Sequence, residues 1–431
     1  MTRRRRESAS RSTFVPRLKS LEGLNMYELL KGMRVVEVSA FIAAPYAGLS
    51  LAQMGAEVIR IDPIGGGLDY RRWPVTKDGR SLYWAGLNKG KKSIALNVRE
   101  EKGREIAHAL MTEAGPQKGL VITNLPPRGW LAYDGLKAKR EDLIMISIVG
   151  NRDGSVALDY TVNAAAGFPL VTGPVDHDQP VNHVMPVWDV VAGLSAVQGL
   201  MAAERKRSET GEGAFVQLAL SDTAFATLSH LGYIGEAEVN GEDRPKTGNH
   251  VFGTYAQDFA TADGRRIMVT AFTPRHWQVL VEATNTETKM KAIEEEFGFD
   301  LKREENRYAA RDPITDVLGA WFQQHDFATV TAALDEAGAC WGPYQSVTQA
   351  VAEDPRLSTE SPLFDEIDQP GIGRYRAAGA MLDFAGIDRQ PVQPAPILGQ
   401  DTDRVLAEIL GFNDAELGRL HDDGIIGGPT P

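Results

Sequence analysis

One aspartate stands where a side-chain carboxylate could act as a nucleophile. Asp189 opens a run of small and apolar residues, 188–205, which predicts a helix that is apolar nearly all round and therefore buried. At the amino end of such a helix, backbone N–H groups favour an ionised carboxylate and can stabilise an oxyanion. A carboxylate placed there can attack an activated acyl group such as a thioester. Taken alone, however, the residue type favours the simpler role of a helix N-cap.

Other kinds of reactive site are less well supported. The single cysteine, Cys340, excludes an internal disulfide framework or a zinc cluster of several thiolates, and fits a reducing, cytoplasmic compartment. We interpret it as a small packed residue. Asp62 ends a predicted strand, where dinucleotide-binding folds keep their ribose-binding acid, but residues 39–44 contain no G-x-G-x-x-G pattern. A nicotinamide enzyme is therefore disfavoured.

Composition sets further limits. The chain has 431 residues, of which 43% are apolar and 24% charged, the balance of a folded globular protein. Its net charge of -12 argues against general nucleic-acid binding, and no run approaches the roughly eighteen apolar residues of a membrane span. Residues 1–25 contain seven basic and two acidic side chains, so the rest of the chain is the more acidic part. We interpret residues 1–25 as a disordered basic leader.

From residue 33 onward, strands alternate with helices. Strands are predicted over 34–38, 56–62, 92–96, 119–123, 143–148 and 215–220, and helices over 45–54, 101–114 and 188–205. The first strand, helix and strand take about thirty residues, the length of a βαβ unit, which implies a right-handed crossover and a parallel sheet. Residues 209–213 predict a turn. This part of the chain is therefore predicted to be an open α/β sheet.

The stretch from about 249 to 344 has a different character. Residues 261–264 read as a hairpin-like turn between short strands, and amphipathic patterns typical of helices follow. We interpret this stretch as a smaller inserted α+β domain.

Four segments in order resemble the class III CoA-transferase family, the group of formyl-CoA transferase and carnitine CoA-transferase: residues 32–62, 88–94, 189–213 and 395–405. The resemblance implies an open, Rossmann-like large domain built from residues 26–224 and 375–431, with linkers and the small domain in 225–374. It also implies an interlocked homodimer with its active site between the domains. The substrate would be an acyl-CoA, with no separate cofactor and no metal.

The resemblance also assigns roles to individual residues. Asp189 corresponds to the family nucleophile. The implied CoA contacts are Phe41 and Ile42, largely through backbone, with Leu96, Arg99, Asn124, Leu125 and Leu220. For a substrate carboxylate in the acyl pocket, the candidates are Arg71 and Arg72 beside Trp73, and His183. Pro63 stands where the family often has a basic residue, so Arg128 or Arg152 is a candidate to hold a CoA phosphate in its place.

Three further segments, 65–76, 84–90 and 129–133, resemble a family member that moves CoA between the two carboxyl groups of mesaconate. The implied reaction is intramolecular, and the partners are the acyl-CoA and a second copy of the chain, with no nucleic acid and no membrane. An intermolecular CoA-transferase with a separate dicarboxylic acid acceptor shares all these residues and stays open. An α-methylacyl-CoA racemase is disfavoured, because Leu158 stands where that enzyme needs a proton-transferring histidine.

Overall fold

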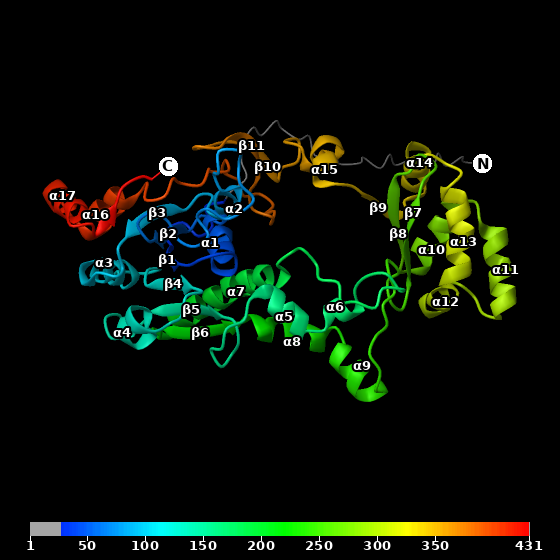
Figure 1. Ribbon diagram of the computed structural model, residues 1–431, viewed down its shortest axis with the longest axis horizontal. Coiled ribbons are helices and arrows are strands. Elements are labelled where there is room, and N and C mark those ends of the chain that lie inside the picture. The colour runs from blue at the N-terminus through cyan, green and yellow to red at the C-terminus, as the bar shows by residue number, and fades with distance from the viewer. Residues whose placement is uncertain (1–26, 431) are drawn as a thin grey trace, which may run out of the picture.

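The computed structural model describes residues 27–430, so the predicted leader lies outside the described part of the chain. A large α/β body surrounds a seven-stranded sheet, and a smaller body surrounds a three-stranded sheet (Figure 1). The two bodies lie at opposite ends of the view and are joined by the segments that follow α9 (Tyr233–Asn240) and precede α15 (Val347–Glu353). The predicted α/β class is confirmed.

The large sheet has the strand order β12-β3-β2-β1-β4-β5-β6. Its strands are β1 (Arg34–Val38), β2 (Glu57–Asp62), β3 (Lys92–Leu96), β4 (Leu120–Thr123), β5 (Ile144–Val149), β6 (Ala214–Ala219) and β12 (Ile426–Gly427). All neighbouring pairs are parallel except β12 with β3. Most side chains of the central strands are buried on both faces of the sheet, as expected of a parallel sheet covered on both sides.

Helices cover both faces of this sheet (Figure 1). One face carries α1 (Ala43–Gln53), α5 (Asp159–Ala165), α7 (Val187–Thr210) and α8 (Leu220–His230), whose apolar residues share one core cluster. The other face carries α3 (Glu101–Met111), α4 (Tyr133–Lys137), α16 (Thr402–Leu410) and α17 (Asp414–Asp422). Segments from both ends of the chain therefore build the same core.

Two expectations about α7 were wrong. The helix continues to Thr210 and is capped by Gly211, which adopts the left-handed conformation. The turn therefore begins at residue 211, two residues after the predicted start at 209. The helix is also buried on one stripe only, and Leu194 on its outer side is 41% exposed. The small residues of the stripe serve close packing against α1 and the sheet, and the apolar residues outside it remain uncovered in this chain.

The small body forms around the antiparallel strands β7 (Tyr255–Ala260), β8 (Arg266–Ala271) and β9 (Cys340–Tyr344). Its helices are α10 (Pro274–Ala283), α11 (Glu287–Phe297), α12 (Glu304–Ala309), α13 (Arg311–Phe322) and α14 (Phe327–Ala337). The predicted turn between β7 and β8 is present, where the Thr261 N–H donates to the Arg265 carbonyl at 2.8 Å. Cys340 is exposed, which corrects its interpretation as a packed residue, because β9 is an edge strand.

A short hairpin returns the chain from the small body to the large one. It consists of β10 (Phe364–Gln369) and β11 (Gly373–Ala378), so the predicted boundary between residues 374 and 375 falls inside β11. The Gln369 amide pairs with the backbone of Ala395, accepting and donating at 2.9 Å. Short helices α2 (Leu82–Leu87), α6 (Phe168–Val171), η1 (Gly129–Leu131) and η2 (Pro355–Leu357) complete the described elements. Across residues 27–430, no helix has both the length and the apolar character that a membrane crossing requires.

Candidate active site

The strand order reverses direction between β1 and β4, since α1 and α3 lie on opposite faces of the sheet. In open α/β sheets, ligands bind outside the carboxyl ends of the strands at such a switch point. Asn124, after β4, bridges to the loop after β1: its Oδ1 accepts from the Ala40 N–H at 2.9 Å, and its Nδ2 donates to the Ala40 carbonyl at 2.6 Å. The two loops at the edge where a ligand is expected are thus locked to each other.

The residues expected to contact CoA all follow or end strands at this same edge of the sheet. Phe41 and Ile42 follow β1, Leu96 and Arg99 end or follow β3, Asn124 and Leu125 follow β4, and Leu220 follows β6. Their availability to a ligand differs. Leu96 is 0% exposed and Leu220 6% exposed, so their side chains belong to the core, whereas Arg99 is exposed. The amide of Asn124 is already occupied by Ala40.

Phe41 has an unusual backbone conformation for a residue with a side chain. Its φ is +65°, in the left-handed region that favours glycine. Its N–H donates to Asp69 Oδ2 at 3.1 Å. The Arg72 guanidinium carbon lies 5.3 Å from the centroid of its ring. The loop after β1 is therefore held by one acidic residue and covered by one basic residue.

Close packing of two helices brings this loop toward Asp189. At Gly193, one turn beyond Asp189 on α7, an added Cβ would lie 2.8 Å from the Ala43 carbonyl oxygen and 3.1 Å from Tyr46 Cβ. Only glycine permits this approach of α7 to the start of α1. Because Ala43 directly follows the loop after β1, the first turn of α7 lies beside that loop.

Asp189 is not the N-cap of its helix. The N-cap is Pro186, and the cap is supplied from α5, where Asp159 Oδ2 accepts from the Trp188 and Asp189 N–H groups at 2.7 and 3.0 Å. Within residues 27–430, no protein group donates a hydrogen bond to the Asp189 carboxylate. Its carboxylate is therefore free for another task.

The pKa of Asp189 is raised to about 7, chiefly by burial and also by the negative charge of Asp159, while Arg72 opposes both. A carboxylate with a raised pKa is more basic, and hence more nucleophilic, than an ordinary aspartate. Burial also raises the pKa of Tyr83 to about 12. The Tyr83 hydroxyl is buried without a hydrogen-bond partner in the described chain, and the Arg72 guanidinium lies 5.4 Å from its ring centroid.

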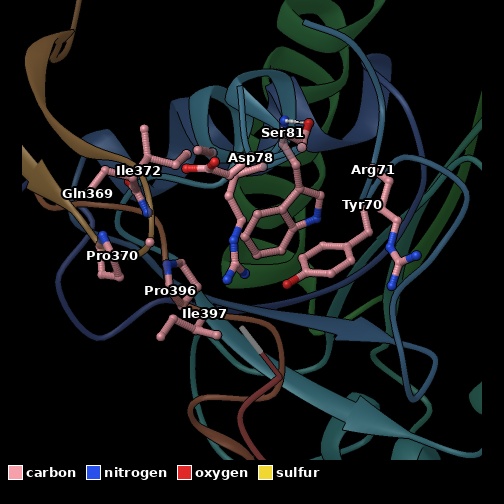
Figure 2. A pocket seen from close by; sticks show the side chains of 14 residues that line it. Tyr70, Arg71, Asp78, Ser81, Gln369, Pro370, Ile372, Pro396 and Ile397 are labelled. Carbon is pink, nitrogen blue, oxygen red and sulfur yellow. Dashed lines mark hydrogen bonds between the residues drawn. The ribbon is translucent and has the colours of Figure 1, made fainter. Parts of the chain in front are cut away.

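The acyl-pocket candidates are separated by the structure. Arg72 lies with Asp189 and Tyr83, whereas Arg71 lines a cavity of about 520 Å³ whose lining includes neither of them (Figure 2). Trp73 is 77% exposed. His183 Nε2 lies 3.0 Å from Asn163 Oδ1, which also accepts from the Trp188 indole at 3.2 Å, so His183 does lie near the start of α7.

The CoA-phosphate candidates also differ. Arg152 pairs with Asp222 at 2.7 Å, and Arg128 precedes η1. Within the described residues, no side-chain contact places either arginine beside the loop after β1.

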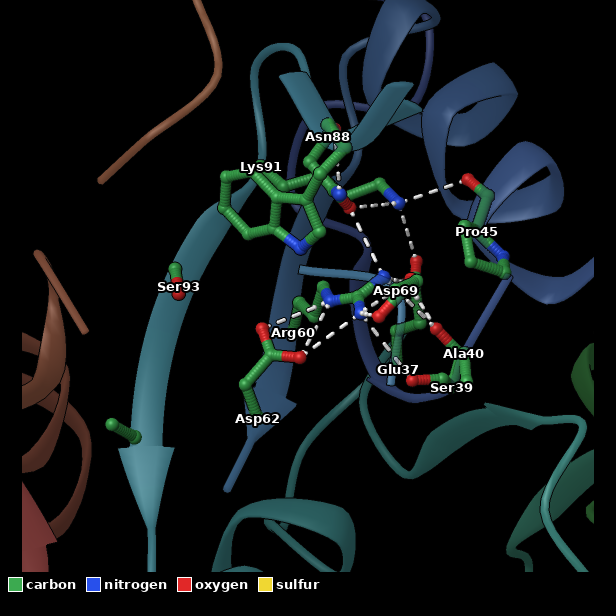
Figure 3. Close-up of polar contacts among 12 residues, drawn as sticks. Glu37, Ser39, Ala40, Pro45, Arg60, Asp62, Asp69, Asn88, Lys91 and Ser93 are labelled. Carbon is green, nitrogen blue, oxygen red and sulfur yellow. Dashed lines mark hydrogen bonds and ion pairs between the residues drawn. The ribbon is translucent and has the colours of Figure 1, made fainter. Parts of the chain in front are cut away.

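A cluster of buried charges lies beside the loop after β1 (Figure 3). Arg60 is fully buried and contacts three acids: Asp62 through Nε at 2.9 Å, Asp69 through Nη2 at 3.0 Å, and Glu37 through Nη1 at 3.4 Å. Lys91 Nζ completes the cluster 2.8 Å from Glu37 Oε2. Asp62 therefore neutralises a buried arginine, which explains an acid at this position without a dinucleotide.

Burial lowers the pKa of Lys91 to about 8, although Glu37 opposes the shift. Burial alone would lower the pKa of Arg60, but Asp62, Asp69 and Glu37 outweigh it and raise that pKa. Gly48 on α1 makes room for the cluster, since a Cβ there would lie 1.8 Å from Glu37 Oε2. Within residues 27–430, no group of three His, Cys, Asp or Glu side chains is arranged to hold a metal ion.

Sequence reasoning missed Tyr83, Asp159 and the role of Asp69. Each is separated from Asp189 by 30 to more than 100 positions in the chain, and no local pattern links them. Asp159 carried a weak signal, since it follows Leu158 in the segment compared with racemases. The capping contact itself depends on how α5 packs against α7.

Comparison with known proteins identifies the family. Residues 30–402 match the model of CoA-transferase family III. The chain is 50% identical to 2-methylfumaryl-CoA isomerase of Chloroflexus aurantiacus, over 94% of this chain and 99% of that protein. It is 27% identical to succinyl-CoA:mesaconate CoA-transferase of Haloarcula marismortui, over 88% of this chain and 96% of that protein.

Solved structures agree at the level of the fold. A CAIB/BAIF family protein from Brucella suis superposes with a TM-score of 0.72 at 24% identity, covering 89% of this chain and all of that one. A protein from Mycobacterium tuberculosis gives a TM-score of 0.69 at 21% identity, covering 86% and 97%. The chain therefore belongs to CoA-transferase family III.

Proposed function

We propose that this protein moves CoA between the two carboxyl groups of mesaconate, converting 2-methylfumaryl-CoA to 3-methylfumaryl-CoA within one substrate molecule. The observation that carries the proposal is the 50% identity to 2-methylfumaryl-CoA isomerase over 94% of the chain. The site around Asp189 supplies chemistry that fits this reaction.

Asp189 is the proposed nucleophile. Its carboxylate attacks the thioester carbonyl, and collapse of the tetrahedral adduct expels the CoA thiolate and leaves a mixed anhydride. The thiolate then attacks the aspartyl carbonyl, which gives an aspartyl-CoA thioester and free mesaconate. The other carboxylate of mesaconate attacks this thioester, a second anhydride forms, and the thiolate attacks its mesaconyl carbonyl. The product is the isomeric thioester, and Asp189 is regenerated.

Two neighbours of Asp189 suit the charges in these steps. Arg72 is a cation that can pair with the carboxylate of mesaconate that is not reacting. The Tyr83 hydroxyl, buried and without a partner in the described chain, can donate to an oxyanion as it forms. Both groups act more strongly in a site from which water is excluded.

CoA enters as part of the substrate, and we propose no separate cofactor. Ile42 is the N-cap of α1 and makes no side-chain cap, so the first N–H groups of that helix remain available to the thioester end of CoA. Phe41 can contribute its ring but not its N–H, which Asp69 already uses. The other expected CoA-binding positions lie at the same carboxyl edge of the sheet, where ligands of open α/β folds bind.

The competing function is intermolecular transfer to a separate acid, as named for the Haloarcula relative. Purified protein incubated with mesaconyl-CoA alone should convert one thioester isomer into the other. Chromatography that separates the two isomers measures the conversion. Strict dependence on an added dicarboxylic acid would favour the intermolecular reaction instead. Isotope-labelled free mesaconate gives the control, because intramolecular transfer should leave the label out of the product.

We further propose that the protein works as a homodimer, in the cytoplasm. Large apolar side chains are strongly exposed around α5 to α9: Leu158 at 62%, Leu170 at 63%, Val175 at 71%, Val184 at 92%, Leu231 at 60% and Val239 at 84%. Exposed apolar clusters of this kind mark interaction surfaces. Light scattering coupled to gel filtration should give twice the 47.0 kDa chain mass, and a monomer would contradict the proposal.

A further inference from the structure

We propose that Asp69 is a positioning residue of the acyl-transfer site: it fixes the loop after β1 through the Phe41 N–H, and the Phe41 ring in turn supports Arg72 beside Asp189. The inference rests on the proposed function, which supplies the reaction that the site performs. Asp69 itself contacts neither Asp189 nor any predicted reacting atom.

A single carboxylate joins the buried ion cluster to the loop. Asp69 is 1% exposed, and its two oxygens accept from Arg60 Nη2 at 3.1 and 3.0 Å. Its Oδ2 also accepts from the Phe41 N–H at 3.1 Å. Arg60 is held in turn by Asp62 and Glu37, so Asp69 has little freedom to move. The loop is therefore anchored to a buried, multiply bonded ion cluster of the sheet.

Phe41 needs such an anchor. A left-handed conformation is unfavourable for a residue with a Cβ, and it persists only where the surroundings impose it. On one side, Asn124 holds Ala40 with two hydrogen bonds. On the other side, Asp69 holds the N–H of Phe41. Without Asp69, the backbone of Phe41 can relax toward an ordinary conformation, and its ring then moves.

The ring of Phe41 lies 5.3 Å from the guanidinium carbon of Arg72, and the ring of Tyr83 lies 5.4 Å from it. Such cation–π contacts fix where the guanidinium sits. The charged groups facing Asp189 are Arg72 from the loop after β2 and Asp159 from α5, with the Tyr83 hydroxyl on α2. A shift of Arg72 therefore changes the charge balance at Asp189.

Asp62 provides a matched control. It is also 1% exposed and binds the same Arg60, through Nε at 3.0 and 2.9 Å and through Nη2 at 2.9 Å. No hydrogen bond links its side chain to the loop after β1. Asp69→Ala and Asp62→Ala each remove one partner of the same buried cation, but only the first removes the bond to Phe41.

The experiment compares the two variants in steady-state kinetics and in CoA binding. For Asp69→Ala we expect kcat to fall about 10- to 100-fold. We also expect the acid limb of the kcat/KM profile to move to higher pH, because a displaced Arg72 lowers the pKa of Asp189 less than before. For Asp62→Ala we expect less than about a threefold change in kcat and no movement of the acid limb, despite a similar drop in Tm. Asp69→Asn, whose amide oxygen can still accept from Phe41, should recover most of kcat.

Free CoA binding, measured by titration calorimetry, does not depend on turnover. Asp69→Ala should weaken it at least about fivefold and Asp62→Ala should leave it nearly unchanged, a difference of about 1 kcal/mol. Equal losses of kcat and CoA affinity in the two variants, with no shift of the acid limb, would show that Asp69 only stabilises the fold. Should Asp69→Ala not fold, Asp69→Leu and Asp62→Leu fill the same volumes and give the same comparison. A wild-type protein that binds CoA but does not isomerise mesaconyl-CoA contradicts the proposed function alone.

Discussion

Asp189 and Asp69 are both aspartates near an arginine in the same body of the protein, yet their surroundings differ. Asp69 is 1% exposed, shares Arg60 with two other acids, and accepts three hydrogen bonds. Asp189 is half-buried, receives no hydrogen bond within the described chain, and has Asp159 as a like-charged neighbour. Burial is costly to a charge in both places, but only the Arg60 cluster compensates it with partners.

The contrast separates a structural from a chemical use of the same residue type. A carboxylate that accepts three hydrogen bonds and pairs with a buried arginine is held in place and is not available as a nucleophile. A carboxylate with burial but few partners is held in a less stable, more basic form, at some cost to folding. The five predictions that follow each test one side of this contrast.

The largest effect should come from Asp189→Asn. The amide keeps the volume of the side chain but cannot form an anhydride, so kcat should fall by about 10⁴-fold or more. Chromatography of the two thioester isomers measures the loss, and circular dichroism checks the fold. Retention of more than a tenth of wild-type turnover would falsify the role of Asp189 as nucleophile.

Arg60→Met should cause the largest loss of stability. It leaves Asp62, Asp69 and Glu37 buried without their shared cation, and breaking a buried ion pair costs about 3–5 kcal/mol. Urea unfolding measures the change in free energy. Arg205→Met is the control, because Arg205 pairs with Glu209 at 81% side-chain exposure and such pairs contribute at most about 1 kcal/mol. Similar losses in the two variants would contradict the assigned role of the cluster.

Two adjacent arginines should differ in their effect on catalysis. Arg72→Met removes the cation beside Asp189 and should lower kcat/KM about 10- to 100-fold while raising the apparent pKa of the acid limb. Arg71→Met alters only the separate cavity and should change kcat/KM less than about threefold. If Arg71→Met has the larger effect, the structure has assigned the acyl pocket to the wrong arginine.

The pH profile tests the charge that Asp159 places next to Asp189. Wild-type activity should decline as the pH falls through about 7, where Asp189 becomes protonated. Asp159→Asn removes the negative charge but keeps an oxygen for the N–H groups of α7, so the acid limb should move to lower pH by about one unit. Rates measured between pH 5 and 9 test this expectation, and an unmoved acid limb would show that Asp159 does not contribute to the pKa of Asp189.

The smallest effect concerns stability at Asp189, the proposed nucleophile. The pKa of Asp189 is raised from 3.8 to about 7, so the folded state keeps a proton that the unfolded chain has lost across that interval. The associated stability is present below pH 3.8 and is lost as the pH rises through about 7. Asp189→Asn should therefore be more stable than wild type at pH 8, by about 1 kcal/mol or a few degrees in Tm, with no gain near pH 4. An equal gain at both pH values would point to a cause other than titration.

The sequence predicted the central architecture closely. The strands over residues 34–38 and 92–96 occur with the expected bounds. Short apolar runs bounded by turn residues are typical of buried strands, which is why their positions could be predicted. The predicted hairpin of the small body is also present, because the turn residues between its two strands favour a tight reversal of the chain. The end of α7 was placed too early, since Arg207 is an interior helical residue whose guanidinium binds the backbone of Lys118 from another segment.

The site was predictable only in part. Asp189 was singled out because it opens a helix of small residues and corresponds to the family nucleophile. The CoA-binding positions were carried over from the family resemblance, and both assignments stay predictions. Arg71 and Arg72 are adjacent in sequence, and only the packing of their loop sends one to Asp189 and the other to a separate cavity. The exposure of Cys340 depended likewise on whether β9 would be a central or an edge strand.

By itself, then, the sequence determined the main strands of the central sheet and the helix that carries Asp189, and its motifs carried the resemblance to a family. Local propensity and apolar periodicity decide where strands and helices form, and both can be read directly from the amino-acid sequence. The tertiary structure alone decided that Asp159 caps α7, that Asp69 holds Phe41, and that Asp189 is left without a partner. Those outcomes depend on contacts between segments far apart in the chain, and such contacts set how strongly each buried charge is compensated.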